Sequence, residues 1–296
     1  MRISVSVTDY SYQGTPDALA DRLAETAVAA EEAGLDVLWV NDHLLQAAPG
    51  AAPDAEMLEA YTTLGFLAAR TTRIQLGTMV TPVTMRLPAV LIKAVTTLDV
   101  LAGGRAWLGL GAGYKLEEAE AMGLPLPPTQ ERFARLEETV QLAHRMWAGD
   151  TSPFNGEYYQ LTHPVSSPVP LQRPHPPILI GGAGERHTLA LVARYADACN
   201  LFDIPDGGRT IRHKLQVLAR HCQAAGRPFD AIERTVSGRL TPSEPIEMFV
   251  AHCAELAGLG IQHVVLITDG PWTVELIGHL ADAVSRVSAI QSANPH

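Results

Sequence analysis

Cysteine is scarce in this chain, and the spacing of the cysteines excludes both a disulfide-rich protein and a cysteine-based zinc protein. An odd number of cysteines without a C-x-x-C pair fits neither a disulfide framework nor a cysteine-based zinc site. The three are Cys199, Cys222 and Cys253. We therefore expect reduced thiols, in a protein of the cytoplasm.

Long hydrophobic runs and positive charge are also lacking. No apolar run reaches the roughly 18 residues that a membrane-spanning helix needs, and we find no signal peptide behind the N-terminal MRISVSV. The 22 lysines and arginines are outnumbered by 32 aspartates and glutamates, which gives a formal net charge of −10. Nucleic acids and anionic membranes bind basic surfaces. We expect neither as a partner and expect a small organic molecule instead.

The sequence is rich in a repeated strand–helix unit. Hydrophobic residues make up 47% of the 296 residues, and short apolar stretches bounded by turn residues alternate with longer helical ones, as in buried parallel sheets. The predicted strands are 3–7, 37–40, 74–78, 106–111, 178–180, 198–202, 235–239 and 263–267. The predicted helices are 16–33, 56–70, 88–102, 131–148, 185–195, 210–225, 246–259 and 273–289.

Eight such units predict an α/β fold, the (β/α)8 TIM barrel, built as one domain over residues 1–296. The alternation pauses at about residues 150–177, which are rich in proline and contain the turn pair Asn155-Gly156. We therefore expect an insertion with a small hairpin between helix 4 and strand 5. An open doubly wound sheet is the rival, but its G-x-G-x-x-G fingerprint should follow the first strand. Here alternate glycines follow the fourth strand, at Gly109, Gly111 and Gly113.

The rule that a TIM barrel carries its active site at the carboxyl ends of the strands singles out His43. It is the only histidine at such an end, directly after Asp42. Imidazole titrates near neutral pH and suits proton transfer. A purely structural histidine, hydrogen-bonded by Asp42, is an equally open interpretation of the position.

Two glycine-rich segments also leave predicted strands. Gly181-Gly182-Ala183-Gly184 leads into a helix, where free N–H groups and the positive end of the helix dipole favour a phosphate. The alternate glycines of residues 109–113 leave a flat space in which a planar ring could lie. A tight turn in the first case, and close strand–helix packing in the second, would explain the same glycines without a ligand.

Lysine is almost missing, which narrows the chemistry that a barrel could perform. A Schiff-base aldolase needs a lysine inside the barrel mouth. Lys93 and Lys214 fall in predicted helices, and Lys115 falls in a loop. No set of His, Asp and Glu gathers at the predicted strand ends, so we expect no metal site.

Several motifs in the right order resemble the luciferase-like monooxygenase superfamily, and within it the oxidoreductases that depend on the deazaflavin coenzyme F420. The segment Trp39-Val40-Asn41-Asp42-His43 resembles the W-x-x-D-H motif after their second strand. Residues 76–82 and 86–89 resemble their third strand and the helix beyond it. Further similar segments are 98–105, 108–114, 131–138, 173–182 and 193–197. The resemblance covers nearly the whole chain.

The resemblance implies a cofactor, F420 or alternatively FMN, at the carboxyl ends of the strands. It implies that Asp42 and His43 are the catalytic residues beside the ring, and that a non-proline cis peptide bond lies around residues 78–80. Homodimers are common in the family. The cofactor-binding residues that it implies are Asp42, His43, Met79, Val80, Thr81, Gly111, Ala112, Gly113, Tyr114, Gly181, Gly182, Ala183 and Gly184.

The sequence also departs from the sugar-phosphate dehydrogenases of this family. Tyr114 stands where they have a glutamate, residues 44–47 lack their aromatic side chain, and the lysines that hold their sugar phosphate are almost missing. We therefore expect a substrate other than a sugar phosphate. Residues 46–55 are rich in alanine and proline, which predicts a less polar substrate mouth.

Four functions remain open from the sequence. The first is an F420-dependent oxidoreductase that transfers a hydride between the deazaflavin and an organic substrate. The second is an FMN-dependent luciferase-like monooxygenase. The third is a non-catalytic flavin-binding barrel, and the fourth is a barrel lyase or isomerase without a redox cofactor.

Overall fold

A closed barrel of parallel strands forms the centre of the computed structural model, which describes residues 1–12, 18–47, 51–52, 54–241 and 244–293. The main sheet has the order β3-β2-β1-β11-β10-β9-β8-β5-β4 with parallel neighbours throughout. A parallel bridge between Leu76 and Ala106 joins β3 to the start of β5 and closes the ring. The (β/α)8 fold predicted from the alternation is confirmed.

Each predicted strand is present, with small shifts at the ends. The strands are β1 (Arg2–Val7), β2 (Val37–Val40), β3 (Gln75–Thr78), β4 (Thr81–Pro82), β5 (Leu108–Gly111), β8 (Ile178–Gly181), β9 (Ala198–Phe202), β10 (Glu233–Arg239) and β11 (His263–Ile267). The short β4 was not predicted. It continues the chain of β3 after a break and pairs with β5.

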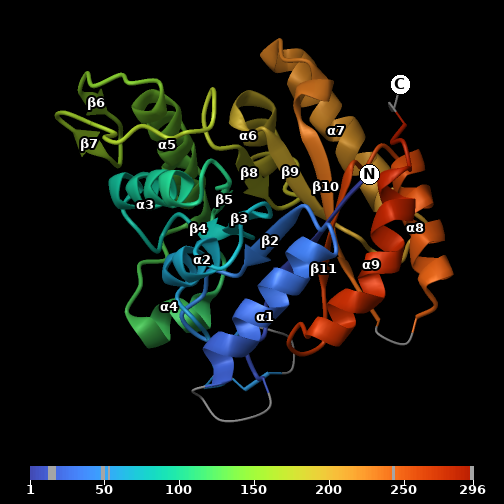
Figure 1. Cartoon of the computed structure of the whole chain (residues 1–296). Helices are drawn as coiled ribbons and strands as arrows, with labels where there is room; N and C mark the ends of the chain where they lie inside the picture. Colours follow the sequence, from blue (N-terminus) through green and yellow to red (C-terminus); the bar gives the residue numbers. More distant parts are fainter. Residues whose placement is uncertain (13–17, 48–50, 53, 242–243, 294–296) are drawn as a thin grey trace.

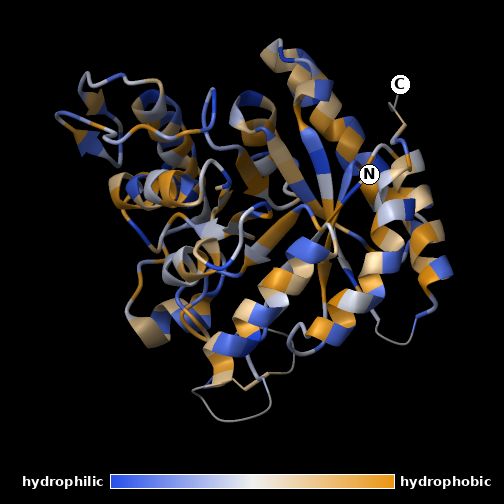
Figure 2. Cartoon of the chain, in the orientation of Figure 1, coloured by the Kyte–Doolittle hydropathy of each residue, from blue (hydrophilic) through white to orange (hydrophobic). Residues whose placement is uncertain are grey.

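Helices surround this barrel (Figure 1). They are α1 (Leu19–Glu32), α2 (Ala60–Ala68), α3 (Pro88–Leu101), α4 (Leu116–Met122), α5 (Thr129–Trp147), α6 (Thr188–Tyr195), α7 (Arg209–Ala225), α8 (Ile246–Gly258) and α9 (Val274–Ser288). Figure 2 shows that they carry apolar and polar residues together. In α9 the buried positions are apolar and helically spaced, at Ile277, Leu280, Ala283, Val284 and Val287.

The helix α4 was not predicted from the sequence, and it proves important for the site. It has only seven residues, begins with Glu117 and Glu118 in its first turn, and ends at Gly123. Gly123 has a φ of 66°, a left-handed conformation that glycine adopts without steric cost. The helix stands between β5 and α5, where the sequence reading expected a loop.

The segment of residues 150–177 lies between α5 and β8 and holds the expected hairpin. Its two short antiparallel strands, β6 (Phe154–Asn155) and β7 (Gln160–Leu161), lie beside α5 (Figure 1). The carboxylate of Glu138 on α5 accepts backbone N–H bonds from Glu157, Tyr158 and Tyr159. The hairpin is thus fastened to α5 at the outside of the barrel.

The amino-terminal end of the barrel is closed by a network of charged side chains. Arg2 on β1 donates to both carboxylate oxygens of Glu233 on β10, at 3.0 and 3.1 Å. The fully buried His263 on β11 lies 3.2 Å from Glu233 and 2.5 Å from the hydroxyl of Ser4. This network leaves the opposite, carboxyl-terminal end of the barrel for a ligand.

Candidate active site at the carboxyl ends of the strands

A cavity of about 880 Å³ opens at the carboxyl ends of the barrel strands. Its wall includes His43 after β2, the residue pair Met79 and Val80 after β3, and the glycine segments that follow β5 and β8. All of the predicted site residues except Asp42 and Thr81 line it. Segments distant in sequence therefore converge on one space, with His43 and the turn of residues 181–184 at the same end of the barrel.

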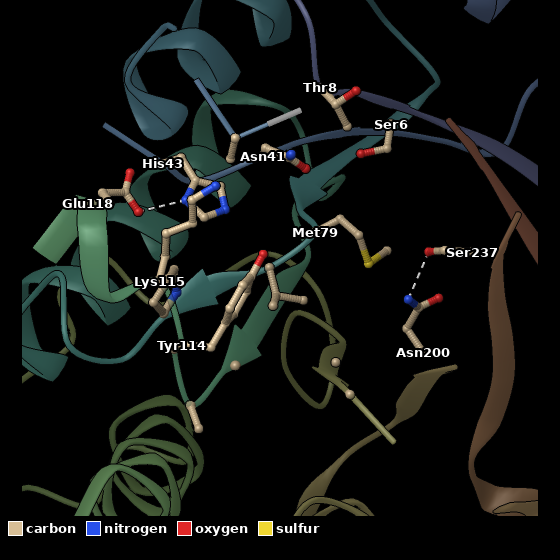
Figure 3. A pocket seen from close by; sticks show the side chains of 18 of the residues that line it. Ser6, Thr8, Asn41, His43, Met79, Tyr114, Lys115, Glu118, Asn200 and Ser237 are labelled. Atoms are coloured by element: carbon tan, nitrogen blue, oxygen red, sulfur yellow. Dashed lines mark hydrogen bonds and ion pairs between the residues drawn. The ribbon is translucent and has the colours of Figure 1, made fainter. Parts of the chain in front are cut away.

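The imidazole ring of His43 is hydrogen-bonded on the side away from the cavity by Glu118, a residue that was not predicted to belong to the site. Its Nδ1 lies 2.7 Å from the carboxylate of Glu118 on α4. Figure 3 shows Glu118 on one side of the imidazole ring and the cavity on the other. Among the described residues the second ring nitrogen, Nε2, has no hydrogen-bond partner, so His43 presents it to the cavity.

Asp42 is adjacent in sequence but lies behind the cavity wall. It is 1% exposed, and the guanidinium group of Arg86 donates hydrogen bonds to both of its carboxylate oxygens, at 2.5 and 3.0 Å. The hydroxyl of Thr81 donates to the same carboxylate at 2.7 Å. Arg86 also donates to Glu59 and lies over the ring of Tyr61. Asp42 and Thr81, which the resemblance implies as cofactor-binding residues, therefore do not line the cavity.

Val80 forms a bulge into the cavity at the end of β3. The Met79–Val80 peptide bond is cis, as the resemblance implies for this segment. A Cβ atom added at Gly111 would lie 2.8 Å from the Val80 side chain, and one added at Gly181 would lie 3.0 Å from it. Both glycines therefore make room for Val80, which stands between them and the open part of the site.

The turn after β8 offers unpaired backbone donors. Gly182, with a φ of 115°, donates its N–H to the carbonyl of Asn200, whereas the N–H groups of Ala183 and Gly184 have no partner among the described residues. The helix α6 begins four residues later, at Thr188, and its first turn has no side-chain cap. Free N–H groups at a helix start are suited to a phosphate.

A polar wall on β1, β9 and β10, which was not predicted, completes the cavity. Ser6 is 1% exposed, lines the cavity, and its hydroxyl has no partner among the described residues. Asn200 accepts from the hydroxyl of Thr235 at 2.8 Å and donates to the hydroxyl of Ser237 at 2.8 Å. Figure 3 shows Ser6, Asn200 and Ser237 across the cavity from His43, with Met79 between.

The mouth of the cavity is nearly neutral. Arg239, at the end of β10, is ion-paired with Asp269 after β11. Lys115 is the one lysine or arginine that lines the cavity without a carboxylate partner among the described residues. Two exposed aromatic side chains, Tyr114 and Phe202, also line the mouth.

Neither a metal-binding cluster nor a membrane-spanning helix is found in the described part of the chain. Within the described ranges there is no group of three or more His, Cys, Asp or Glu side chains that could hold a metal ion. No helix in the same ranges is long and apolar enough to cross a membrane.

Comparisons with known proteins agree with this architecture. An F420-dependent glucose-6-phosphate dehydrogenase from Kineococcus radiotolerans is 38% identical over 75% of this chain, which spans 64% of that relative's length. The structure of an F420-dependent secondary alcohol dehydrogenase with an F420-acetone adduct superposes with a TM-score of 0.81 at 18% identity, covering 97% of this chain and 99% of the other. A monooxygenase from Streptomyces bottropensis gives a TM-score of 0.78 at 18% identity, over 98% and 100% of the two chains.

The family itself follows from the match over most of the sequence. Residues 1–282 match the profile described as luciferase-like monooxygenase. The chain belongs to the luciferase-like monooxygenase family.

Proposed function

We propose that this protein is an F420-dependent oxidoreductase that transfers a hydride between the deazaflavin and a small organic substrate. The observation that carries the proposal is the convergence of His43, the Val80 bulge and the turn of residues 181–184 on one cavity. Relatives that share a third or more of their aligned residues with this chain are named as F420-dependent dehydrogenases.

The residues present fit a flat ring with a phosphate-bearing tail. Met79 and Val80 would support one side of the ring, and Gly111, Ala112, Gly113 and Tyr114 would lie along it. The N–H groups of Ala183 and Gly184, beside Gly181 and Gly182, would receive the phosphate. Asp42 and Thr81 would not contact the cofactor directly. Their hydrogen bond outside the cavity would fix the position of the segment that carries His43. When bound, F420 supplies a ring carbon that accepts or releases a hydride.

The protein's own contribution to the reaction is positioning, exclusion of water and proton transfer. His43 would take up or release the substrate proton at Nε2, the ring nitrogen that faces the cavity. Leu124, Leu126 and Phe133 give the same cavity an apolar side that limits water.

The charges of the cavity favour an uncharged substrate, such as a secondary alcohol or its ketone. A sugar phosphate carries two negative charges and needs unpaired cations. Arg239 is already paired with Asp269, which leaves Lys115 as the single unpaired lysine or arginine of the cavity among the described residues. Asp9, Glu118 and Asp269 add negative charge to the wall. The residues outside the described ranges include no lysine or arginine. Hydroxyl and amide groups such as Ser6, Asn200 and Ser237 suit a neutral oxygen.

Side-by-side titration with F420 and FMN tests the cofactor. We expect saturable binding of F420, and loss of the visible absorbance of the oxidised deazaflavin when a neutral secondary alcohol is added. A panel of such alcohols is compared with glucose 6-phosphate. Binding of FMN alone, with oxygen consumed during turnover, would support the monooxygenase alternative. Binding of neither would favour a barrel without redox chemistry.

The state of assembly and the location are further parts of the proposal. We propose that the chain acts as one domain. We also propose that it pairs as a homodimer through α3, because the side chains of Leu87, at the N-cap of this helix, and of Val90 and Leu101, within it, are exposed. Light scattering of the purified protein measures the mass and contradicts the dimer if it finds a monomer. The cytoplasmic location stays a prediction, consistent with three buried free cysteines in the described chain.

A further inference from the structure

Glu118 on α4 is buried, and both of its carboxylate oxygens have hydrogen-bond partners. It is 3% exposed on α4. One oxygen lies 2.7 Å from Nδ1 of His43, and the other accepts the backbone N–H groups of Leu44 at 2.6 Å and Leu45 at 3.1 Å. The carboxylate therefore binds His43 and the two residues that follow it as one unit.

The carboxyl group of Glu118 is ionised in this setting. Burial on its own would raise its pKa, but the hydrogen bonds from His43, Leu45 and Leu44 outweigh burial and lower the pKa below its usual value. An ionised carboxylate only accepts hydrogen bonds. The hydrogen between Glu118 and the imidazole ring must then lie on Nδ1 of His43.

We propose that Glu118 is a positioning residue that fixes the tautomer of His43, so that Nε2 faces the substrate as a free lone pair. The proposal rests on the proposed function for the reaction itself, but the tautomer is a property of the protein without ligand. A neutral imidazole has one N–H. With that N–H donated to Glu118, the nitrogen exposed to the cavity is the proton acceptor.

The arrangement assigns each proton and electron pair when an alcohol is oxidised. The hydroxyl proton of the substrate would pass to Nε2 of His43, and the carbon-bound hydrogen would leave with its electron pair as the hydride that F420 accepts when bound. The substrate carbon would become a carbonyl carbon, and the two electrons would reside on the deazaflavin. Glu118 stabilises the imidazolium ring thus formed, which then returns its proton to water. In the reverse direction the imidazolium donates from Nε2.

Substitution of Glu118 by glutamine separates this role from simple packing. The carboxamide is nearly isosteric and its oxygen can still accept from Leu44 and Leu45. Its NH2 group would instead donate to Nδ1, which would place the imidazole hydrogen on Nε2, toward the cavity. A base of the wrong tautomer cannot accept the substrate proton. Glu117→Gln is the matched control, because Glu117 precedes Glu118 on the same helix and is exposed.

Nitrogen-15 NMR of histidine-labelled protein without cofactor reads the tautomer directly, and His43→Asn identifies the His43 signals. We expect a protonated Nδ1 in the wild type and in E117Q, and a protonated Nε2 in E118Q. In turnover assays we expect E118Q to keep its affinity for F420 but to lose about 10²-fold or more in kcat, the usual range for general acid–base catalysis.

Two results would overturn the proposal. One is a wild-type His43 that carries its hydrogen on Nε2, a measurement that needs no variant to fold. The other is an E118Q protein that binds F420 and keeps kcat within twofold of wild type. Failure of the wild type to bind F420 would instead contradict the proposed function and leave the NMR result to decide the role of Glu118.

Discussion

At the scale of single residues, Asp42 and His43 are adjacent in sequence but have different hydrogen-bond partners in the structure. One of the two interpretations that the sequence left open was a structural His43 hydrogen-bonded by Asp42. In the structure that partner is Glu118, which lies 75 positions further along the chain. The carboxylate of Asp42 instead accepts hydrogen bonds from Arg86 and Thr81. The position of His43 at a strand end was predictable because the barrel rule depends only on strand boundaries. Its partner depends on a helix too short to show a periodic pattern.

Removal of Arg86 tests how tightly Asp42 is held. In Arg86→Ala the carboxylate of Asp42, 1% exposed, loses its cation. A buried charge without its partner costs about 3–5 kcal/mol of unfolding free energy. Denaturant unfolding measures the loss, with the exposed pair of Arg22 and Glu25 as control, where Arg22→Ala should cost less than about 1 kcal/mol. Equal small losses at both positions would show that Asp42 does not depend on Arg86.

The space around Val80 gives a second prediction. In Gly111→Ala the new methyl group would lie 2.8 Å from Val80 and push it toward the cavity. We expect overpacking to cost about 1–3 kcal/mol of unfolding free energy and F420 affinity to fall by about tenfold, or about 1.4 kcal/mol.

The double variant Gly111→Ala with Val80→Ala supplies the check on that prediction. Removing the Val80 methyl groups relieves the contact, so the double variant should regain stability relative to Gly111→Ala alone. Gly65→Ala on α2 is the control, since nothing lies within 4 Å of a Cβ atom there. Purely additive effects of the two substitutions would refute the contact between Val80 and the glycines.

At the scale of elements, the sequence predicts strands better than helix starts. The strands Val37–Val40, Ala198–Phe202 and His263–Ile267 match the predicted ranges at both ends, because buried apolar runs end abruptly at polar residues. The helices predicted from residues 56 and 185 begin later, at Ala60 and Thr188. In α2 the side chain of Glu59 caps the helix by accepting from Thr62, so the actual start is set by one hydrogen bond rather than by helix propensity.

The β10 strand contributes a pH-dependent interaction through Glu233. Burial would raise the pKa of this carboxyl, but the hydrogen bond and charge of His263, with Arg2, lower it to about 2. A depressed pKa stabilises the folded state above the ordinary value of 4.5, and the contribution is lost as the pH falls toward 2. By linkage the contribution at neutral pH is at most about 3 kcal/mol.

Urea unfolding of wild type and Glu233→Gln at several pH values tests this interaction. The difference in unfolding free energy between the two proteins should be largest near pH 7 and should shrink as the pH falls below about 4.5, where the carboxyl of the unfolded chain takes up its proton. A difference that stays constant down to pH 3 would contradict the role assigned to the charge of Glu233.

At the scale of the whole molecule, an acidic chain encloses a cavity lined by two lysines or arginines among the described residues, of which Arg239 is paired and Lys115 is not. The composition indicated the acidic surface, and the resemblance indicated which strand ends meet. The wall of Ser6, Asn200 and Ser237 was not predictable, because small polar residues inside strands give no local signal. These residues meet only when β9 pairs with β10 and β11 joins β10 to β1. The proposed preference for a neutral substrate rests on this wall and on the ion pair of Arg239 and Asp269 at the mouth.

Release of Arg239 tests the electrostatic account of the substrate. In Asp269→Asn the guanidinium group loses its carboxylate partner at the mouth. We expect the KM for a phosphate-bearing alcohol to fall several-fold at low salt, with the gain lost as added salt screens the charges. The KM for a neutral alcohol should stay unchanged. If both substrates respond alike, Arg239 and Asp269 do not set the charge preference.

The most direct test of the whole account is a crystal structure of the protein with F420. We expect the deazaflavin ring in the barrel cavity, supported by Met79 and Val80 and facing His43, with the phosphate at the N–H groups of Ala183 and Gly184. A ring bound elsewhere, or a phosphate far from that turn, would contradict it.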